Sequence, residues 1–372
     1  MMKETESRKK ILVIRFSSIG DIILTTPVFR YLKNIFPNSE IHFLTREEYS
    51  IILQNNPYIN RIISFNTKKG FSGLRMLKHN LEEEKYHAVF DLHGSLRSRY
   101  LTFLLNSDEI RRIKKYYLKR FLLVKAKINF FRNRGNSGSN RTFSVVEKYL
   151  RTCGFSETSG NFEQIKLELF PLSQDLKNAD LFWKKFAGKS LRLAVAPGAK
   201  HFTKRWPAEY YGELAALLYK KYKLKTVFVG GPDEVQTVNE ICKIADPKEN
   251  FTVNLAGKLS LMETASIISH CSLFISNDSA LMHVASAFQR FQIAIFGSTV
   301  RELGFFPLNP RSRILEKSIA CRPCSHIGRP ECPQRHFDCM REIKPTDVMN
   351  EFSDCMWVFK QAMKKDSGKK RK

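Results

Sequence analysis

Short apolar runs that each lead into a polar, glycine-containing turn and then a helix-like segment recur along this sequence. Ile11–Ile14, Leu193–Ala196, Thr226–Val229 and Leu273–Ile275 have the length and composition of buried strands. Strands joined by single helices lie parallel, because the helical crossover returns the chain to the same end of the sheet. The repeat predicts an α/β fold of doubly wound parallel sheets, with ligands bound beyond the carboxyl ends of the strands.

The chain has 372 residues, enough for two domains with separate cores. Residues 170–188 contain Pro171 and many polar residues, and we expect the connection between the domains there. The predicted architecture is two Rossmann-like domains facing a central cleft, one over residues 1–175 and one over residues 189–345.

The sequence after Pro345 predicts a last helix, with Val348 and Phe352 among its apolar positions, followed by a basic tail. Residues 346–372 therefore form a separate C-terminal segment in the predicted organisation.

The composition limits where this protein works and what it binds. The sequence has no run of about 18 uncharged apolar residues, and its charged start leads directly into a strand-like run. We therefore expect no transmembrane helix and no signal peptide, and a cytoplasmic protein. The formal charge of +26 indicates an anionic partner, which leaves nucleic acid, an anionic membrane surface and a phosphorylated substrate as candidates.

Much of that charge lies in one stretch, residues 111–141, which alternates basic residues with apolar and aromatic ones and contains no acidic residue. Such a stretch is typical of an element that binds a membrane surface or a polyanion, and a solvated helix face near the core is the alternative. Its basic residues are Arg111, Arg112, Lys114, Lys115, Lys119, Arg120, Lys125, Lys127, Arg132, Arg134 and Arg141.

The turn after the first strand carries the first candidate for chemistry. Ser17–Asp21 follows that strand, and Pro27 fits the first position of a helix whose N-cap is Thr26. Asp21 is then expected in the loop before this helix, where it either faces a ligand or is a solvated turn aspartate. His93 follows a later strand and either contacts a phosphate or sugar or is exposed.

The turns of the second half carry further polar residues. The segment Ser276–His283 lies between two apolar runs, so its helix begins at a strand end, where free N–H groups favour a phosphate. Asp278 would repel a phosphate, and we expect it to face a sugar hydroxyl or a ribose, or to cap the helix. Ser260 and Glu263 predict a capping box for another helix.

Four of the eight cysteines fall between Cys321 and Cys339, which favours a metal or redox site over disulfides in a reducing compartment. Four thiolates can bind zinc tetrahedrally, and the first spacing is typical of such sites. Buried reduced thiols and an opportunistic disulfide are the alternatives. The possible ligands are Cys321, Cys324, Cys332 and Cys339.

From Ile11 to about Ile343, this sequence resembles the ADP-heptose:lipopolysaccharide heptosyltransferases of glycosyltransferase family 9. The cysteine pattern looks like that of the heptosyltransferase II branch. Four further blocks carry the resemblance, namely Ser17–Pro27, Pro197–Ala199 with Lys204–Pro207, Gly230–Glu234, and Asn277–Ala280 with His283.

The resemblance implies a GT-B fold, in which the N-terminal domain binds the acceptor, the C-terminal domain binds the nucleotide sugar, and the last helix returns to the N-terminal domain. Asp21 matches the family's base and Lys204 its phosphate-binding lysine. Ala199 and Lys200 stand where some relatives have hydroxyl residues, so either the charge of Lys200 compensates or the donor differs. The implied donor-binding residues are Gly198, Ala199, Lys200, Asp233, Leu259, Asp278, Ser279, Ala280 and His283.

For the acceptor we expect contacts from the first turn, from the loop that carries His93 and from the basic stretch. These residues are Ser18, Gly20, His93, Lys114, Lys115, Lys119 and Arg120.

The resemblance implies an inverting, metal-independent transfer of a heptose, the second one being favoured, from ADP-heptose to the inner core of lipopolysaccharide. No cofactor is expected beyond the possible structural zinc. The expected partners are ADP-heptose, the lipid A–core acceptor and the anionic inner face of the inner membrane, on which the enzyme would be peripheral. The alternatives are transfer of another nucleotide sugar and, in a different class, a basic nucleic-acid-binding protein, although no nucleic-acid motif appears.

Overall fold

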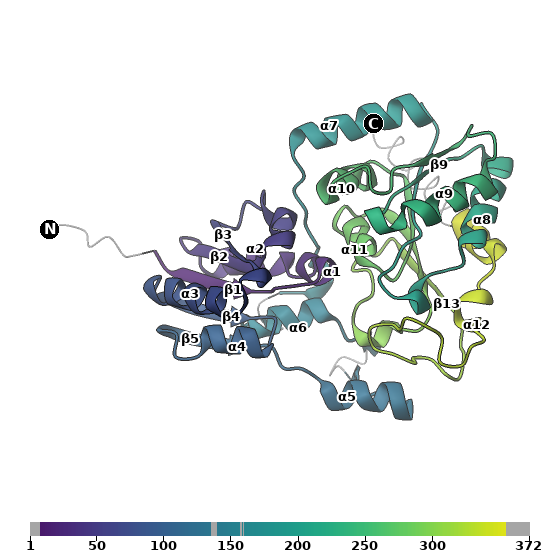
Figure 1. Cartoon of the computed structure of the whole chain (residues 1–372). Helices are drawn as coiled ribbons and strands as arrows, with labels where there is room; N and C mark the ends of the chain where they lie inside the picture. Colours follow the sequence, from purple (N-terminus) through teal and green to yellow (C-terminus); the bar gives the residue numbers. More distant parts are fainter. Residues whose placement is uncertain (1–7, 135–139, 157, 159, 355–372) are drawn as a thin grey trace, which may run out of the picture. The chain divides into compact units, whose positions relative to one another are not determined.

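The computed structural model describes residues 8–354 except 135–139, 157 and 159, and the side chains of 132–141 are also outside that description. It contains two α/β units, each built on one parallel sheet (Figure 1). The first unit comprises residues 1–120, 129–170 and 302–305, and the second comprises residues 121–128, 171–301 and 306–372.

The sheet of the N-terminal unit has five parallel strands in the order β3-β2-β1-β4-β5. Its strands are β1 (Lys10–Ile14), β2 (Glu40–Arg46), β3 (Arg61–Phe65), β4 (Tyr86–Asp91) and β5 (Ser107–Arg112). Its helices are α1 (Ile19–Ile23), α2 (Thr26–Ile35), α3 (Gly70–Glu83), α4 (Leu96–Thr102) and α6 (Val145–Thr152), and a small hairpin is formed by β6 (Arg132–Arg134) and β7 (Asn140–Thr142).

Successive side chains of this sheet pack into apolar layers on its two faces, because side chains alternate along a strand. Leu12, Ile14 and Leu44 belong to a cluster with buried residues of α3 and α4. Phe43 points to the other face, where its ring meets Phe29 of α2 edge-on at 5.3 Å. Helices on both faces make β1 a fully covered central strand, and the loop after it is held firmly.

The sheet of the C-terminal unit has six parallel strands in the order β10-β9-β8-β11-β12-β13. Its strands are β8 (Arg192–Ala196), β9 (Lys225–Phe228), β10 (Thr252–Asn254), β11 (Leu273–Asn277), β12 (Phe291–Phe296) and β13 (Ser312–Glu316). Its helices are α7 (Ser173–Ala187), α8 (Ala208–Tyr222), α9 (Val235–Ala245), α10 (Leu261–Ser269), α11 (Ala280–Ala287) and α12 (Asp338–Arg341).

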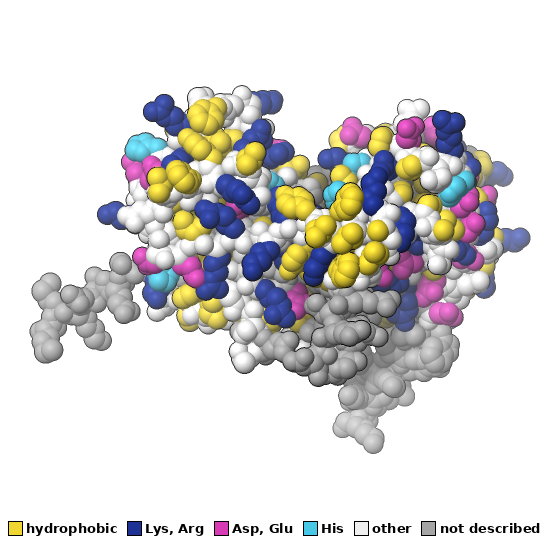
Figure 2. Space-filling model, turned by 90° about the horizontal axis from the view of Figure 1, so that it is seen from below, with side chains coloured by type: hydrophobic (Ala, Val, Ile, Leu, Met, Phe, Trp, Pro, Cys, Tyr) yellow, Lys and Arg dark blue, Asp and Glu magenta, His cyan; other side chains and the backbone are white. Residues whose placement is uncertain are grey.

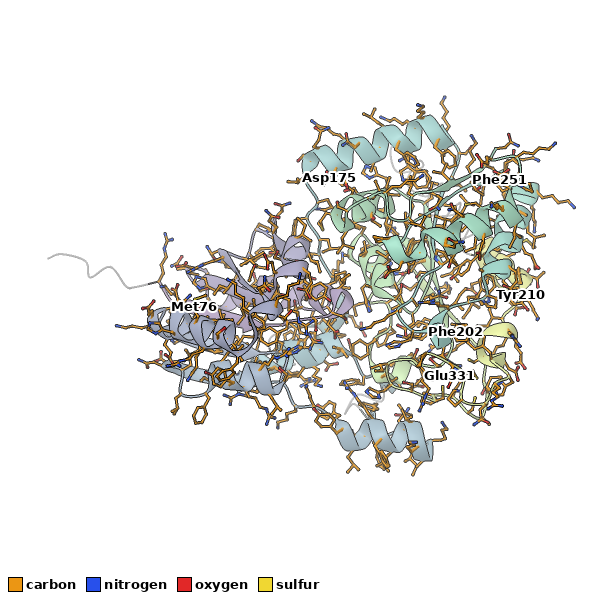
Figure 3. The ribbon with its side chains drawn as sticks, in the orientation of Figure 1. Met76, Asp175, Phe202, Tyr210, Phe251 and Glu331 are labelled. Carbon is orange, nitrogen blue, oxygen red and sulfur yellow. The ribbon has the colours of Figure 1, made fainter. Side chains whose placement is uncertain are left out.

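The segment expected as an interdomain connection, residues 170–188, is largely the helix α7. Trp183 of α7 is fully buried, and its indole N–H donates to the carbonyl of Ile267 in α10 at 3.0 Å. A buried indole with a satisfied N–H fixes a helix firmly. The buried residues of α7 are Ala179, Trp183 and Ala187, and its polar residues lie on the outer side of the helix (Figure 3), which is why the segment resembled a linker in the sequence.

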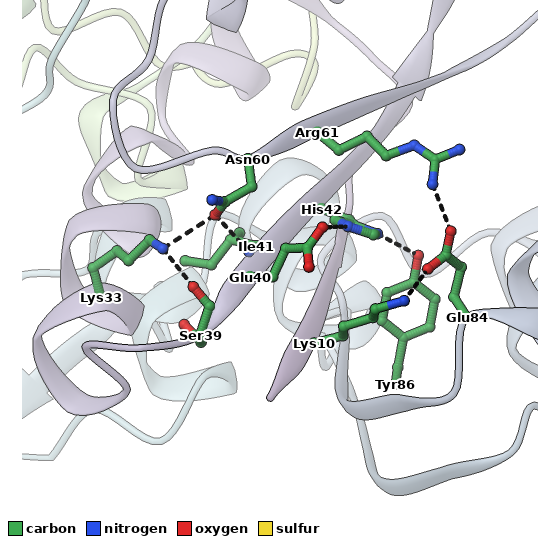
Figure 4. A network of polar contacts seen from close by, with 10 residues as sticks. All are labelled: Lys10, Lys33, Ser39, Glu40, Ile41, His42, Asn60, Arg61, Glu84 and Tyr86. Carbon is green, nitrogen blue, oxygen red and sulfur yellow. Dashed lines mark hydrogen bonds and ion pairs between the residues drawn. The ribbon is translucent and has the colours of Figure 1, made fainter. Parts of the chain in front are cut away.

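The amino ends of the N-terminal strands are closed by a network of polar side chains (Figure 4). Glu84 pairs with Lys10 and with Arg61 at 2.5 Å each. The buried His42 contacts the hydroxyl of Tyr86 at 2.8 Å and the carboxylate of Glu40 at 2.9 Å. The side chains of this network pair with one another, whereas parallel sheets of this class bind ligands at the opposite, carboxyl edge.

Two sequence predictions at the start of the chain need correction. The helix α2 begins at Thr26 and has Thr25, not Thr26, as its N-cap, and neither hydroxyl caps the helix, since they donate back to the carbonyls of Ile22 and Ile23. Asp21 lies in the first turn of the extra helix α1 rather than in a loop. The capping box predicted at Ser260 and Glu263 is confirmed.

The basic stretch 111–141 forms several short elements. Its described part contains the end of β5, α5 (Tyr117–Phe121), a π-helical turn (Leu122–Ala126) and β6. Phe131 and Leu123 are buried, whereas Leu118 and Phe121 are exposed. Aromatic residues of this stretch therefore divide between a core and the surface.

At the C-terminal end, Val348 and Phe352 pack in the core of the C-terminal unit. They belong to a helix whose described part is 345–354. The remainder of the predicted last helix and the basic tail, residues 355–372, lies outside the described residues. Within the described chain, no helix has the length and apolar character needed to cross a membrane.

Candidate active site

Asp21 is held by the turn that joins β1 to α1. It occupies the third position of α1, and both the backbone N–H and the hydroxyl of Ser18 donate to its Oδ2, at 3.1 and 2.8 Å. This is the geometry of a capping box, in which an acidic side chain reaches back to the start of its helix. One oxygen of the carboxylate is therefore held by the local sequence.

The second carboxylate oxygen of Asp21 meets a cation that the sequence analysis did not single out. Arg15, the residue after β1, places Nη2 at 2.6 Å from Oδ1 of Asp21. Its other nitrogens donate to the carbonyls of Ser17 and Leu92, at 2.7 and 2.8 Å. Tyr149 of α6 also donates its hydroxyl to Oδ1 of Asp21, at 3.3 Å.

These contacts decide the protonation state of Asp21. Burial raises the pKa of a carboxyl group, but the charge of Arg15 and the hydrogen bonds from Ser18 outweigh it, so the pKa of Asp21 lies below the usual aspartate value. The side chain is 18% exposed, so one part of the carboxylate can still be reached. The site thus presents a carboxylate that is ionised and fixed in orientation at neutral pH.

The loop after β4 lies beside this site and is ordered by Asp91. The carboxylate of Asp91 accepts the backbone N–H groups of His93 and Gly94, at 3.0 and 2.8 Å, and the hydroxyl of Ser98 at 2.8 Å. The ring of His93 packs on Phe16 at 4.8 Å.

His93 is neutral in this environment. Burial, together with the charges of Arg15 and Lys115, lowers its pKa to about 3. Its Nδ1 is buried and has no hydrogen-bond partner among the described residues. The ring is part of the wall beside Asp21, and its predicted contact with the acceptor stays a prediction.

The other residues predicted to bind the acceptor differ in exposure. Ser18, Lys114 and Lys119 are exposed, Lys115 and Arg120 are half-buried, and Gly20 is buried. All belong to the N-terminal unit that carries Asp21.

In the C-terminal unit, the predicted phosphate-binding lysine is paired with a carboxylate. Lys204 places its Nζ at 2.7 Å from Oδ2 of Asp278, and the hydroxyl of Thr299 donates to the same oxygen at 2.6 Å. Asp278 follows β11 and is 6% exposed. The pair lies beyond the carboxyl ends of β8 and β11, the two strands between which the strand order reverses, where this class of fold binds its ligands.

The side chain of Asn277 joins the loops around this pair. Its Oδ1 accepts the backbone N–H of Trp206 at 3.1 Å and the hydroxyl of Tyr211 at 3.0 Å. Its Nδ2 donates to the carbonyl of Pro197 at 2.6 Å. One fully buried amide therefore holds the loop after β8, the start of α8 and the end of β11 together.

The start of α11 carries the next predicted residues, Ser279, Ala280 and His283. Ser279 is the N-cap of α11, Ala280 is its first residue, and His283 is buried one turn later. The hydroxyl of Ser279 is buried and makes no hydrogen bond to any described residue. A hydroxyl and free N–H groups at a helix start suit a phosphate oxygen or a sugar hydroxyl.

The glycine turns after β8 and β9 are filled by Glu234, a residue that the sequence analysis did not select. The Glu234 carboxylate lies so close to Gly198 and Gly230 that a side chain at either position would collide with it. Burial raises the pKa of Glu234, while the N–H of Gly231 and the charge of Arg205 act against that rise. The acidic pair in Gly230–Glu234 was visible in the sequence, but it could not show which acid points inward.

The remaining residues predicted for the donor surround the same turns. Ala199 is buried and its carbonyl accepts from Arg205 at 2.7 Å, whereas Lys200 and Asp233 are exposed. Leu259 is half-buried in the loop that begins at Gly257, whose N–H donates to the carbonyl of Gly230 at 3.1 Å. These residues thus border the carboxyl ends of β8, β9 and β10.

All four clustered cysteines are reduced, and only Cys339 is buried. Cys321 contacts His336 at 3.9 Å between Sγ and Nε2. Among the residues that the structure describes, no three histidine, cysteine or acidic side chains are placed to hold a metal ion together. Zinc binding by Cys321, Cys324, Cys332 and Cys339 stays a prediction.

Comparison with known proteins points to one family. Residues 74–334 match the family model described as glycosyltransferase family 9 (heptosyltransferase). The chain is 26% identical to lipooligosaccharide heptosyltransferase 2 of Campylobacter jejuni, covering 92% of this chain and 98% of that relative. It is 24% identical to lipopolysaccharide heptosyltransferase 1 of Campylobacter coli, covering 91% and 97%.

A solved structure of the ADP-heptose lps heptosyltransferase II of E. coli matches this fold with a TM-score of 0.71 at 21% identity. The match covers 94% of this chain and 99% of that one. The predicted GT-B class, with two parallel-sheet α/β domains, is confirmed.

Replacing Asn277 by alanine should lower the free energy of unfolding by about 3 kcal/mol, because several buried backbone and side-chain groups lose a partner at roughly 1 kcal/mol each. Urea denaturation of the two proteins measures this difference. Asn254→Ala, which removes a partly exposed amide from the same unit, is the control and should cost less. A loss of less than about 1 kcal/mol for Asn277→Ala would contradict the role given to this side chain.

Proposed function

Because the chain belongs to glycosyltransferase family 9, we propose that it transfers a heptose from ADP-heptose to the inner core of lipopolysaccharide, and that it adds the second heptose. The observation that carries this proposal is the Asp21 carboxylate, which Arg15 and Ser18 hold ionised at the carboxyl end of β1. Glycosyl transfer to a hydroxyl needs a base that removes the hydroxyl proton, and a fixed carboxylate can do so.

In the proposed reaction Asp21 accepts the proton of the attacking hydroxyl, and the sugar is inverted as ADP leaves from the opposite side. The leaving diphosphate gains charge in the transition state, so a cation aimed at it lowers the barrier. Lys204 is the proposed cation. In the free protein it pairs with Asp278, and the diphosphate would share or replace that contact. With a lysine in this place the proposed reaction requires no metal ion.

Two observations bear on which heptose is added. The cysteine block and the matching solved structure favour heptosyltransferase II, whereas relatives described as heptosyltransferases 1 and 2 are similarly identical to this chain. Transfer of another nucleotide sugar is the alternative within the class. Family membership argues against the basic nucleic-acid-binding protein.

The test of the proposal is the product itself. The purified chain is incubated with ADP-heptose and core acceptors that carry either no heptose or one heptose, and the products are weighed by mass spectrometry. A gain of one heptose on the acceptor that already carries one supports the proposal. A gain only on the heptose-free acceptor would reassign the chain to the first heptose, and no gain on either would overturn the donor or the acceptor.

The basic stretch supports a peripheral position on the anionic inner face of the inner membrane. Leu118 and Phe121 of α5 are 70% and 59% exposed, and exposed lysines lie beside them. Figure 2 shows hydrophobic side chains gathered with lysines and arginines over this segment. Apolar side chains that insert at a lipid surface and lysines that attract anionic headgroups together favour membrane binding.

Replacing Asp21 by asparagine should lower kcat by about a hundredfold or more, the usual contribution of a positioned base, while the affinity for ADP stays nearly unchanged. Asparagine has the same shape but cannot take the proton. Steady-state kinetics and calorimetric titration of ADP measure the two effects, and a melting curve checks that Arg15, left without its partner, has not unfolded the site. Retention of more than about a tenth of kcat would exclude Asp21 as the base.

Replacing Leu118 and Phe121 by serine should reduce binding to vesicles of anionic lipid about tenfold, because each side chain inserted in lipid contributes on the order of 1 kcal/mol. Transfer to an acceptor embedded in vesicles should fall more than transfer to a soluble, delipidated acceptor. Leu181→Ser, which removes a leucine that is 63% exposed on α7, is the matched control. Unchanged vesicle binding in the double variant would leave the solvated-surface interpretation of this stretch.

A further inference from the structure

Lys148 is a buried cation that forms no ion pair with an acidic residue in the described part of the chain. It lies on α6 and is 7% exposed. Among the residues that the structure describes, no carboxylate forms an ion pair with it, and its Nζ lies over the ring of Tyr116 at 4.6 Å. A buried charge is costly unless an opposite charge or hydrogen-bond acceptors compensate it, and the face of one aromatic ring compensates only in part.

Positive charges near Lys148 disfavour its charged form further. Burial lowers the pKa of Lys148 to about 7, and the charges of Arg120, Arg15 and Lys115 lower it in the same direction. Arg15 is neutralised by Asp21, but Arg120 and Lys115 have no ion pair with a described carboxylate. Arg120 and Lys115 of the basic stretch therefore act on Lys148 of α6 as like charges, and an anion bound beside them would remove the repulsion.

The fold makes room for this cluster. Gly94, in the loop ordered by Asp91, has a positive φ of 63°, and a Cβ atom there would lie 3.2 Å from Cε of Lys115. Tyr116, which supports Lys148, is itself held by the rings of Phe131 and Phe143 at 6.1 and 5.7 Å. The ring of Tyr116 thus supports Lys148, and Gly94 leaves space for the side chain of Lys115.

The cluster lies next to the proposed base. Arg15, which pairs with Asp21 and lies over the ring of Tyr149 at 5.6 Å, is one of the charges that act on Lys148. Arg120 interacts electrostatically with both Tyr149 and Asp21. An anion held by these cations would belong to the molecule whose hydroxyl approaches Asp21, that is, to the acceptor rather than to the donor.

We propose that Lys115, Arg120 and Lys148 form a binding site for one oxyanion of the acceptor, a phosphate or a carboxylate, and that this contact positions the attacking hydroxyl at Asp21. The inference rests on the proposed function for the identity of the acceptor. The site itself rests on the buried Lys148, which has no ion pair among the described residues, and on the cations around it. Lys148 is the residue that sequence patterns did not reveal, because it lies outside the basic stretch.

The first test measures the site without any transfer reaction. The full chain is titrated with inorganic phosphate in excess ADP, so that phosphate does not report on the nucleotide site. Phosphate should raise the melting temperature of the wild-type protein and of Lys166→Met, which replaces an exposed lysine of the same unit, but not that of Lys148→Met. Equal stabilisation of wild type and Lys148→Met by phosphate would overturn the site.

The second test identifies the bound group with three acceptors: the intact one, one treated with phosphatase, and one whose carboxylates are reduced to alcohols. Loss of the recognised group should raise the KM of the wild-type enzyme about ten- to hundredfold, as expected for a hydrogen-bonded charge pair. The KM of Lys148→Met for the intact acceptor should rise by a similar factor and no longer depend on that group. The identity of the modification that matters assigns the oxyanion as phosphate or carboxylate.

Lys148→Arg, which keeps the charge, should recover part of the lost affinity, and this separates charge from packing. If the KM of Lys148→Met depends on the acid groups as strongly as that of the wild type, the proposal is wrong. If the wild-type protein transfers no heptose to any acceptor, the proposed function fails, and the phosphate titration still decides whether the site exists.

Discussion

The ion pair between Arg15 and Asp21 is the interaction on which the N-terminal unit depends. A carboxylate as buried as Asp21 would be neutral without a cation, and Arg15 lies close enough to reverse that tendency. The pair also fixes the loops around it, since Arg15 donates to the carbonyls of Ser17 and Leu92. The same contacts that keep Asp21 ionised make it a weaker base, so its contribution depends on orientation as much as on proton affinity.

The two units carry different groups at the same topological position of their sheets. In each sheet the strand order reverses beside the first strand, and the proposed functional residues follow the two strands at that point. In the N-terminal unit they are Asp21 and the loop ordered by Asp91. In the C-terminal unit they are the Lys204–Asp278 pair and the Asn277 amide, which ties three loops to the sheet. The buried strands make both edges rigid, as a positioned reaction requires.

Patterns local in the chain were predictable, and contacts between distant segments were not. The strand before Asp21, the capping box at Ser260 and the parallel sheets follow from short-range apolar and polar spacing. Tyr149 donates to Asp21 from a position 128 residues away, and no spacing rule links them. Glu234 follows Asp233, which was predicted to bind the donor, but only the packed turn shows that the Glu234 carboxylate fills the space beside Gly198. The charge of the basic stretch was visible in the sequence, but the division of its aromatic residues between a core and the surface was not.

The pH dependence of kcat/KM for heptose transfer tests the central claim, that Arg15 holds the proposed base Asp21 ionised, in wild type, Arg15→Gln and Arg15→Lys. The account predicts that the acid limb of the wild type lies below the usual range of an aspartate, because the pKa of Asp21 is lowered. In Arg15→Gln the charge that opposes the effect of burial is lost, and the acid limb should move to higher pH. Arg15→Lys keeps a charge and should stay close to the wild type. An acid limb that is the same in Arg15→Gln and in the wild type would contradict the account.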